Sequence, residues 1–88
     1  SARMDDLIAE LKTHIIQALK LKTVKPENID PDAPLFGGGL GLDSIDALEL
    51  VVMLERNYGI KIEEMEAARA AFASVRAMAK FVTEKRAA

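Results

Sequence analysis

The chemistry of this chain centres on a serine at the point where a glycine-rich loop meets a predicted helix. The run from Gly41 to Leu50 reads Gly-Leu-Asp-Ser-Ile-Asp-Ala-Leu-Glu-Leu, with Ser44 between Asp43 and Ile45. A serine hydroxyl can act as a nucleophile, and at a helix start it can carry a phosphate group, which free backbone N–H groups and the helix dipole favour. A serine can also simply begin a helix. Its position alone leaves these interpretations open.

A catalytic role for Ser44 is disfavoured. A serine nucleophile needs a base, usually an oriented histidine, and the only histidine is His14, in the middle of the first predicted helix. The surrounding residues match neither the Gly-x-Ser-x-Gly elbow nor a P-loop. Asp43, Asp46 and Glu49 lack the spacing of a calcium loop. We therefore expect no catalytic residue and no metal ligand.

The elements that must position Ser44 follow from apolar spacing and helix breakers. Helical spacing predicts a first helix over about 3–20. Prolines and glycines exclude regular structure over 21–43, although a loop this long is uncommon in a small domain. We expect its apolar residues to pin the loop to the core. Asp43 is the predicted N-cap of a second helix, with Asp46 at N3, and Gly59 ends that helix after residue 57 or 58.

Two more helices follow, and no convincing strand is present. A short helix is predicted over 63–71, with Met65, Ala68 and Phe72 facing inward. Ser74 is predicted to cap the last helix, whose inward residues are Val75, Met78, Ala79 and Val82. Three longer helices and one short third helix predict an all-α fold, a small four-helix bundle with a long first loop. The 88 residues are expected to form a single domain, with 1–3 as a flexible tail or an appendage.

The second helix has two apolar stripes. The stripe expected to face the core contains Ala47, Leu50, Val51, Leu54 and Tyr58. On nearly the opposite side lie Ile45, Leu48 and Val52, flanked by Asp46, Glu49, Met53, Glu55 and Arg56. Apolar side chains framed by carboxylates are typical of a docking surface. The alternative is that the long loop or a neighbouring helix covers them.

Charge and composition exclude several function classes. Residues 27–66 hold 2 basic and 10 acidic side chains, which would repel nucleic acid and suit a partner with a basic patch, unless they form only a solvated face. The chain has no cysteine and hence no thiol of its own. It contains neither a run of roughly 20 apolar residues nor a signal-peptide pattern. We expect a cytoplasmic monomer without a membrane span.

The octapeptide from Asp43 to Leu50 resembles the Asp-Ser-Leu signature of acyl carrier proteins, as do the preceding Leu35-Phe36 and Leu40-Gly41. The resemblance extends over about residues 4–85. It implies that a separate, Mg-dependent synthase transfers 4′-phosphopantetheine from coenzyme A onto Ser44, which Asp43 flanks. The thiol of that arm then holds acyl groups as thioesters. The resemblance thus implies a carrier without catalysis of its own.

The resemblance also assigns partner contacts and an acyl-chain site. Asp46, Glu49 and Glu55 match acidic residues that partner enzymes bind through basic patches. These partners are phosphopantetheinyl transferase, ketosynthase and other acyl-processing enzymes. Ile45, Leu48 and Val52 match the apolar contacts on the same helix. The candidates for sheltering an acyl chain between helices are Leu54, Ile62, Ala68 and Phe72.

Departures from the family pattern concern partner recognition. Glycines 37–39 stand where many members have an acidic pair. Arg56 and Asn57 interrupt what is often a run of glutamates, and Lys61 replaces another acid. These differences indicate partners other than those of a housekeeping fatty-acid carrier. The expected role is a discrete carrier in fatty-acid, polyketide or related specialised lipid synthesis, such as aryl polyene synthesis. The alternatives are a peptidyl or D-alanyl carrier and an unmodified helical adaptor.

Overall fold

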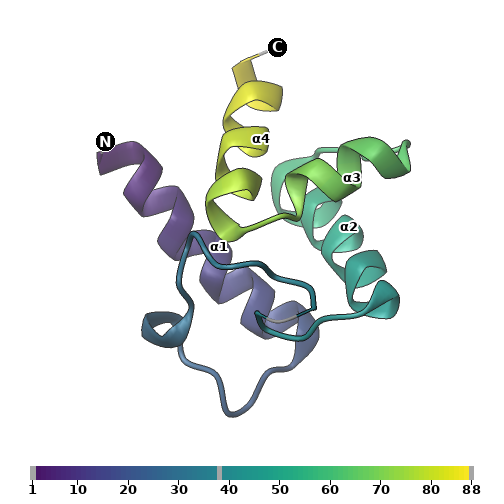
Figure 1. Cartoon of the computed structure of the whole chain (residues 1–88). Helices are drawn as coiled ribbons and strands as arrows, with labels where there is room; N and C mark the ends of the chain where they lie inside the picture. Colours follow the sequence, from purple (N-terminus) through teal and green to yellow (C-terminus); the bar gives the residue numbers. More distant parts are fainter. Residues whose placement is uncertain (1, 38, 88) are drawn as a thin grey trace.

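The computed structural model of the chain describes residues 2–37 and 39–87. Its elements, in order, are α1 (Ala2–Leu19), the 3-10 turn η1 (Pro26–Asn28), α2 (Ser44–Tyr58), α3 (Met65–Ala71) and α4 (Val75–Ala87) (Figure 1). In these two ranges the only β-type pairing is an isolated bridge between Phe36 and Leu42. The all-α prediction is confirmed. Of the predicted tail, Ser1 lies outside the described residues. The other two residues of the tail, Ala2 and Arg3, belong to α1.

Helix α1 buries an apolar stripe and ends in a left-handed turn. Leu11 and Ile15 are fully buried in the core. At the end of the helix, the N–H of Lys20 donates to the carbonyl of Gln17 at 3.3 Å and that of Leu21 to Ile16 at 3.0 Å. Lys20 has a φ of 53°, the conformation that glycine usually supplies at this position. The helix therefore ends one residue before its predicted limit, at a lysine in a conformation unfavourable for its side chain.

Replacing Lys20 by glycine is expected to stabilise the fold. A left-handed backbone costs a residue with a Cβ about 1–2 kcal/mol, and glycine loses about 0.5–1 kcal/mol more backbone entropy on folding. Lys20→Gly should therefore raise the free energy of unfolding by about 0.5–1 kcal/mol, measured by urea denaturation. Lys20→Ala removes the same charge but keeps the strain. If alanine stabilised the protein as much as glycine, the gain would come from charge and not from the backbone.

The long loop is attached to the start of α4, as its apolar residues predict. Leu35 is buried, and its N–H donates to the carbonyl of Ala73 at 3.3 Å. The N–H of Arg76 donates to Pro31 at 2.9 Å, and its Nε donates to Asp32 Oδ1 at 2.6 Å. That hydrogen bond lowers the pKa of the Asp32 carboxyl. The loop thus forms a fixed wall of the molecule next to α3 and α4.

One glycine of this loop has no alternative residue. A Cβ built on Gly39 would collide with the carbonyl oxygen of Pro34, because the loop turns back on itself at that point. Backbone atoms cannot yield as a flexible side chain can. This close approach explains why position 39 is a glycine. The neighbouring Gly38 lies outside the described residues.

The end of α2 is tied to two other helices through Tyr58. Its hydroxyl donates to Glu10 Oε1 at 2.8 Å, and its ring meets the His14 ring edge-on, with centroids 5.6 Å apart. The Arg86 guanidinium lies 4.8 Å from the centroid of the same ring. Burial, together with the Glu10 carboxylate, raises the pKa of Tyr58 far above its usual range. Tyr58 therefore remains a protonated donor that joins α1, α2 and α4.

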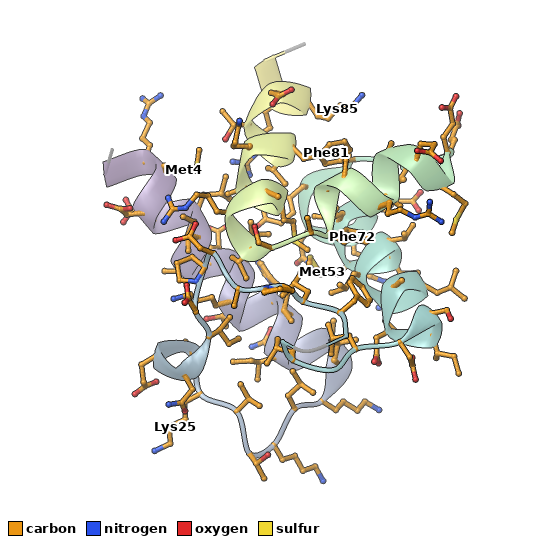
Figure 2. The ribbon with its side chains drawn as sticks, in the orientation of Figure 1. Met4, Lys25, Met53, Phe72, Phe81 and Lys85 are labelled. Carbon is orange, nitrogen blue, oxygen red and sulfur yellow. The ribbon has the colours of Figure 1, made fainter. Side chains whose placement is uncertain are left out.

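Helices α3 and α4 complete the core. Ala68, Phe72 and the four predicted inward residues of α4 are buried, and Figure 2 shows Phe72 and Met53 in the interior while Lys25 and Lys85 point outward. The Ser74 hydroxyl accepts the N–H of Ala77 at 3.0 Å, which confirms the predicted cap. The inward placement of Met65 was wrong, since its side chain is 74% exposed. Helix α3 begins at Met65 rather than at residue 63, and its first residue projects from the core.

Candidate functional site

Ser44 is the first residue of α2, and two carboxylates build the turn that holds it there. Asp43 Oδ1 accepts the N–H groups of Ile45 at 3.0 Å and Asp46 at 3.1 Å. In return, Asp46 Oδ2 accepts the N–H of Asp43 at 3.0 Å. This is the predicted capping box. It places Ser44 on the surface, with its side chain exposed.

The N–H and hydroxyl of Ser44 form no hydrogen bond with any residue in the two described ranges. The N–H groups at a helix start point away from the helix body and lie at the positive end of its dipole. An anion attached to the Ser44 oxygen would therefore find one free donor and a favourable field. The arrangement suits a phosphate ester better than a buried nucleophile.

An open cleft of about 570 Å³ begins beside Ser44. Its walls come from the long loop, the start of α2, and α3 with the residues after it; Figure 1 shows these elements on the same side of the molecule. Its lining is mainly apolar: Pro34, Phe36, Leu42, Asp43, Ser44, Ala47, Met65, Ala68, Arg69, Phe72 and Ala73. Both its size and its lining are in the range of pockets that bind small apolar molecules.

The four residues expected to shelter an acyl chain do not share this cleft. Ala68 and Phe72 line it, whereas Leu54 and Ile62 do not. Leu54 is fully buried on the inward face of α2, and Ile62 packs against the core from the connection between α2 and α3.

Most of the other lining residues of the cleft are not among the predicted site residues. Around α3 a helical spacing signal exists, because Ala68 and Arg69 lie three and four residues after Met65, and Phe72 lies four and three residues after them. For Phe36 and Leu42 no local signal exists. They meet the cleft because the loop folds back and forms a bridge between them.

The second apolar stripe of α2 is exposed. Ile45, Leu48 and Val52, hereafter the docking strip, are 71%, 67% and 42% exposed, so neither the loop nor a neighbouring helix covers them. Glu49 and Glu55 are exposed beside the strip, and Asp46 is half-buried at its start. Met53 was wrongly placed among the flanking residues: it is buried, because α1 packs against that side of α2.

The position of His14 excludes a serine–histidine pair. His14 contacts Tyr58, which is the last residue of the 15-residue helix that Ser44 begins. The two ends of such a helix lie about 20 Å apart. His14 is thus far beyond proton-transfer distance of Ser44.

Within the described ranges, no cluster of three or more His, Cys, Asp or Glu side chains could hold a metal ion, and no helix is long and apolar enough to cross a membrane.

Comparison with known proteins gives a family match and curated relatives. The family profile described as the phosphopantetheine attachment site matches residues 9–82. The mitochondrial acyl carrier protein 2 of Arabidopsis thaliana is 35% identical over 60 residues, which cover 67% of this chain and 47% of the relative. The acyl carrier protein of Thermosynechococcus vestitus is 40% identical over 45 residues, or 51% of this chain and 54% of the relative. The chain spans about half the length of these curated relatives. No solved structure matches it significantly.

Proposed function

Because this chain belongs to the acyl carrier protein family, defined by a phosphopantetheine attachment site, we propose that Ser44 carries the arm and that the chain itself catalyses no reaction. The observation that supports this assignment most strongly is the exposed Ser44 hydroxyl at the start of α2, beside an apolar cleft. The described residues offer Ser44 no histidine base, so a hydrolase reading has no support in the geometry.

The residues around Ser44 fit a covalently attached phosphodiester. The neighbouring carboxylates of Asp43 and Asp46 are already engaged by backbone N–H groups, which offsets part of their repulsion toward a phosphate. The helix start favours the added negative charge. When attached, the arm supplies the thiol that this cysteine-free chain lacks.

The chain's own part in attachment is limited to presenting one oxygen. The Ser44 hydroxyl loses its proton to a base of the transferase, and its oxygen forms the new P–O bond. The nucleotide part of coenzyme A is the leaving group, so one phosphoanhydride bond breaks as the ester bond forms. Asp43 holds the first turn of α2 in place and thereby fixes the backbone that presents Ser44.

The partners are proposed to dock on α2. Phosphopantetheinyl transferase, ketosynthase and other acyl-processing enzymes would place apolar side chains on the docking strip. Their basic patches would face Asp46, Glu49 and Glu55. Complementary charge mainly raises association rates and specificity, and apolar contact adds affinity.

Reversing the charge of Glu49 is expected to slow docking. Glu49→Lys should lower the association rate with a phosphopantetheinyl transferase about three- to ten-fold at low ionic strength, and the difference should shrink as salt is added. Stopped-flow fluorescence at several salt concentrations measures both effects. Glu84→Lys makes the same change of net charge on α4, where it is exposed. An equal effect of the two substitutions would show that overall charge, and not the α2 surface, steers the partner.

The cargo is proposed to be an acyl chain that lies partly in the cleft beside Ser44. Ala68 and Phe72 would contact it directly, whereas Leu54 and Ile62 do not line the cleft. The pathway is fatty-acid, polyketide or related specialised lipid synthesis, with the chain acting as a monomeric single domain in the cytoplasm. Departures such as Arg56 from the usual acidic pattern support a specialised pathway.

Intact-mass measurement tests the proposal. After incubation with coenzyme A and a phosphopantetheinyl transferase, the purified chain should gain the mass of one phosphopantetheine group. An unchanged mass would instead indicate an unmodified helical adaptor. Loading of the modified chain with acyl rather than aminoacyl donors would then distinguish an acyl carrier from a peptidyl or D-alanyl carrier.

A further inference from the structure

A second groove, of about 410 Å³, lies between α1 and α2. His14, Gln17 and Lys20 line it from α1 and the residue after it, and Glu49, Val52 and Arg56 line it from α2. His14 packs against the end of α2, whereas Lys20 lines the groove together with residues nearer the middle of α2. The two helices therefore run antiparallel here (Figure 1). Because Val52 also belongs to the docking strip, the groove continues that surface onto α1.

The groove contains two cations that lack an ion-pair partner. In the described part of the chain the salt bridges are Glu66–Arg69 and Asp32–Arg76, and neither Lys20 nor Arg56 takes part in one. Both side chains are exposed. Arg56 follows Ile45, Glu49 and Val52 at intervals of four, three and four residues, so all four lie along one line of α2. Along this line the charge changes from acidic to basic.

The backbone at Lys20 is an independent observation. Lys20 is the only residue other than glycine with a positive φ among those that the structure describes. Such a conformation is unfavourable for lysine, and it occurs at helix ends and is enriched at ligand sites. Here it follows the end of α1, at a residue that lines the groove.

We propose that this groove binds a carboxylate-bearing segment of the partner enzyme and so selects among partners. The proposal rests on the proposed carrier function and extends its docking surface. A complementary partner presents cations toward Asp46 and Glu49, and an Asp or Glu side chain toward the Lys20–Arg56 pair. An enzyme whose basic patch continues along the whole of α2 is rejected, because its cations would face Arg56.

Titration of the unmodified, isotope-labelled chain with a hexaglutamate peptide tests this by NMR. We expect saturable chemical-shift changes at the backbone amides of residues 17–20 and 52–57, which decrease with added salt. Arg56→Glu and Lys20→Glu should each weaken peptide binding about five-fold or more, and the double variant should abolish the changes. A hexalysine peptide should instead shift amides near Asp46 and Glu49.

The control is Lys61→Glu combined with Lys80→Glu, which makes the same total charge change at two exposed lysines outside the groove. This variant should bind hexaglutamate like the unaltered chain. Absent shifts, shifts confined to other lysines, or an equal loss in the control would overturn the proposal. The titration uses the unmodified chain, so a negative result would not contradict attachment of the arm to Ser44. Conversely, a failure of attachment would not change the result of the titration.

Discussion

Ser44→Ala is expected to abolish phosphopantetheine attachment completely while leaving the fold intact. The substitution removes the only atom proposed to form the ester bond. Because the Ser44 hydroxyl forms no hydrogen bond with the described residues, its loss should change the free energy of unfolding by about 0.5 kcal/mol or less. Intact mass after incubation with coenzyme A and the transferase measures attachment, and urea denaturation measures stability.

Ser74→Ala is the matched control, since Ser74 also stands at the beginning of a helix. Its hydroxyl caps α4 through the N–H of Ala77. Losing that cap should cost about 1 kcal/mol of stability but should leave attachment unaffected. The two variants should therefore show opposite patterns. Continued attachment to the Ser44→Ala chain would mean that the arm is carried elsewhere.

The second large effect is expected for Leu54→Ala, which should lower the free energy of unfolding by about 2–5 kcal/mol. Leu54 is fully buried in the core formed by α2 and its neighbours. Its truncation removes apolar contacts and leaves a cavity. In a domain of this size such a loss would lower the melting temperature by about 10 °C or more.

Leu48→Ala provides the comparison on the same helix. Leu48 is 67% exposed on the docking strip, so its truncation should change stability by about 0.5 kcal/mol or less and should instead weaken partner binding. Equal destabilisation by the two substitutions would contradict the assignment of one leucine to the core and the other to the surface.

The parts of this structure that depend on neighbouring residues could be predicted from the sequence. The capping box at Asp43 and Asp46 and the left-handed Gly59 that ends α2 involve residues within one turn of the helix end. The same is true of the Ser74 cap. Their donors and acceptors lie within five positions of one another, so residue type and spacing suffice. These local signals placed Ser44 at the start of α2.

Features that depend on packing between distant segments could not be predicted in this way. Met53 has the helical position of a flanking residue, and only the packing of α1 on that side of α2 buries it. The cleft beside Ser44 requires the loop residues Phe36 and Leu42 to meet α3, a contact that no periodicity encodes. Likewise, an amphipathic pattern does not tell whether an inward residue such as Leu54 faces a cleft or the solid core.

The most direct test is fragment mass spectrometry on the chain isolated from its native host, which locates any attached group on the sequence. We predict a phosphopantetheine ester on the peptide that contains Ser44 and on no other peptide, with an acyl group on its thiol in part of the molecules. A chain whose Ser44 is unmodified in the host, or whose modification lies on another residue, would contradict the proposed function.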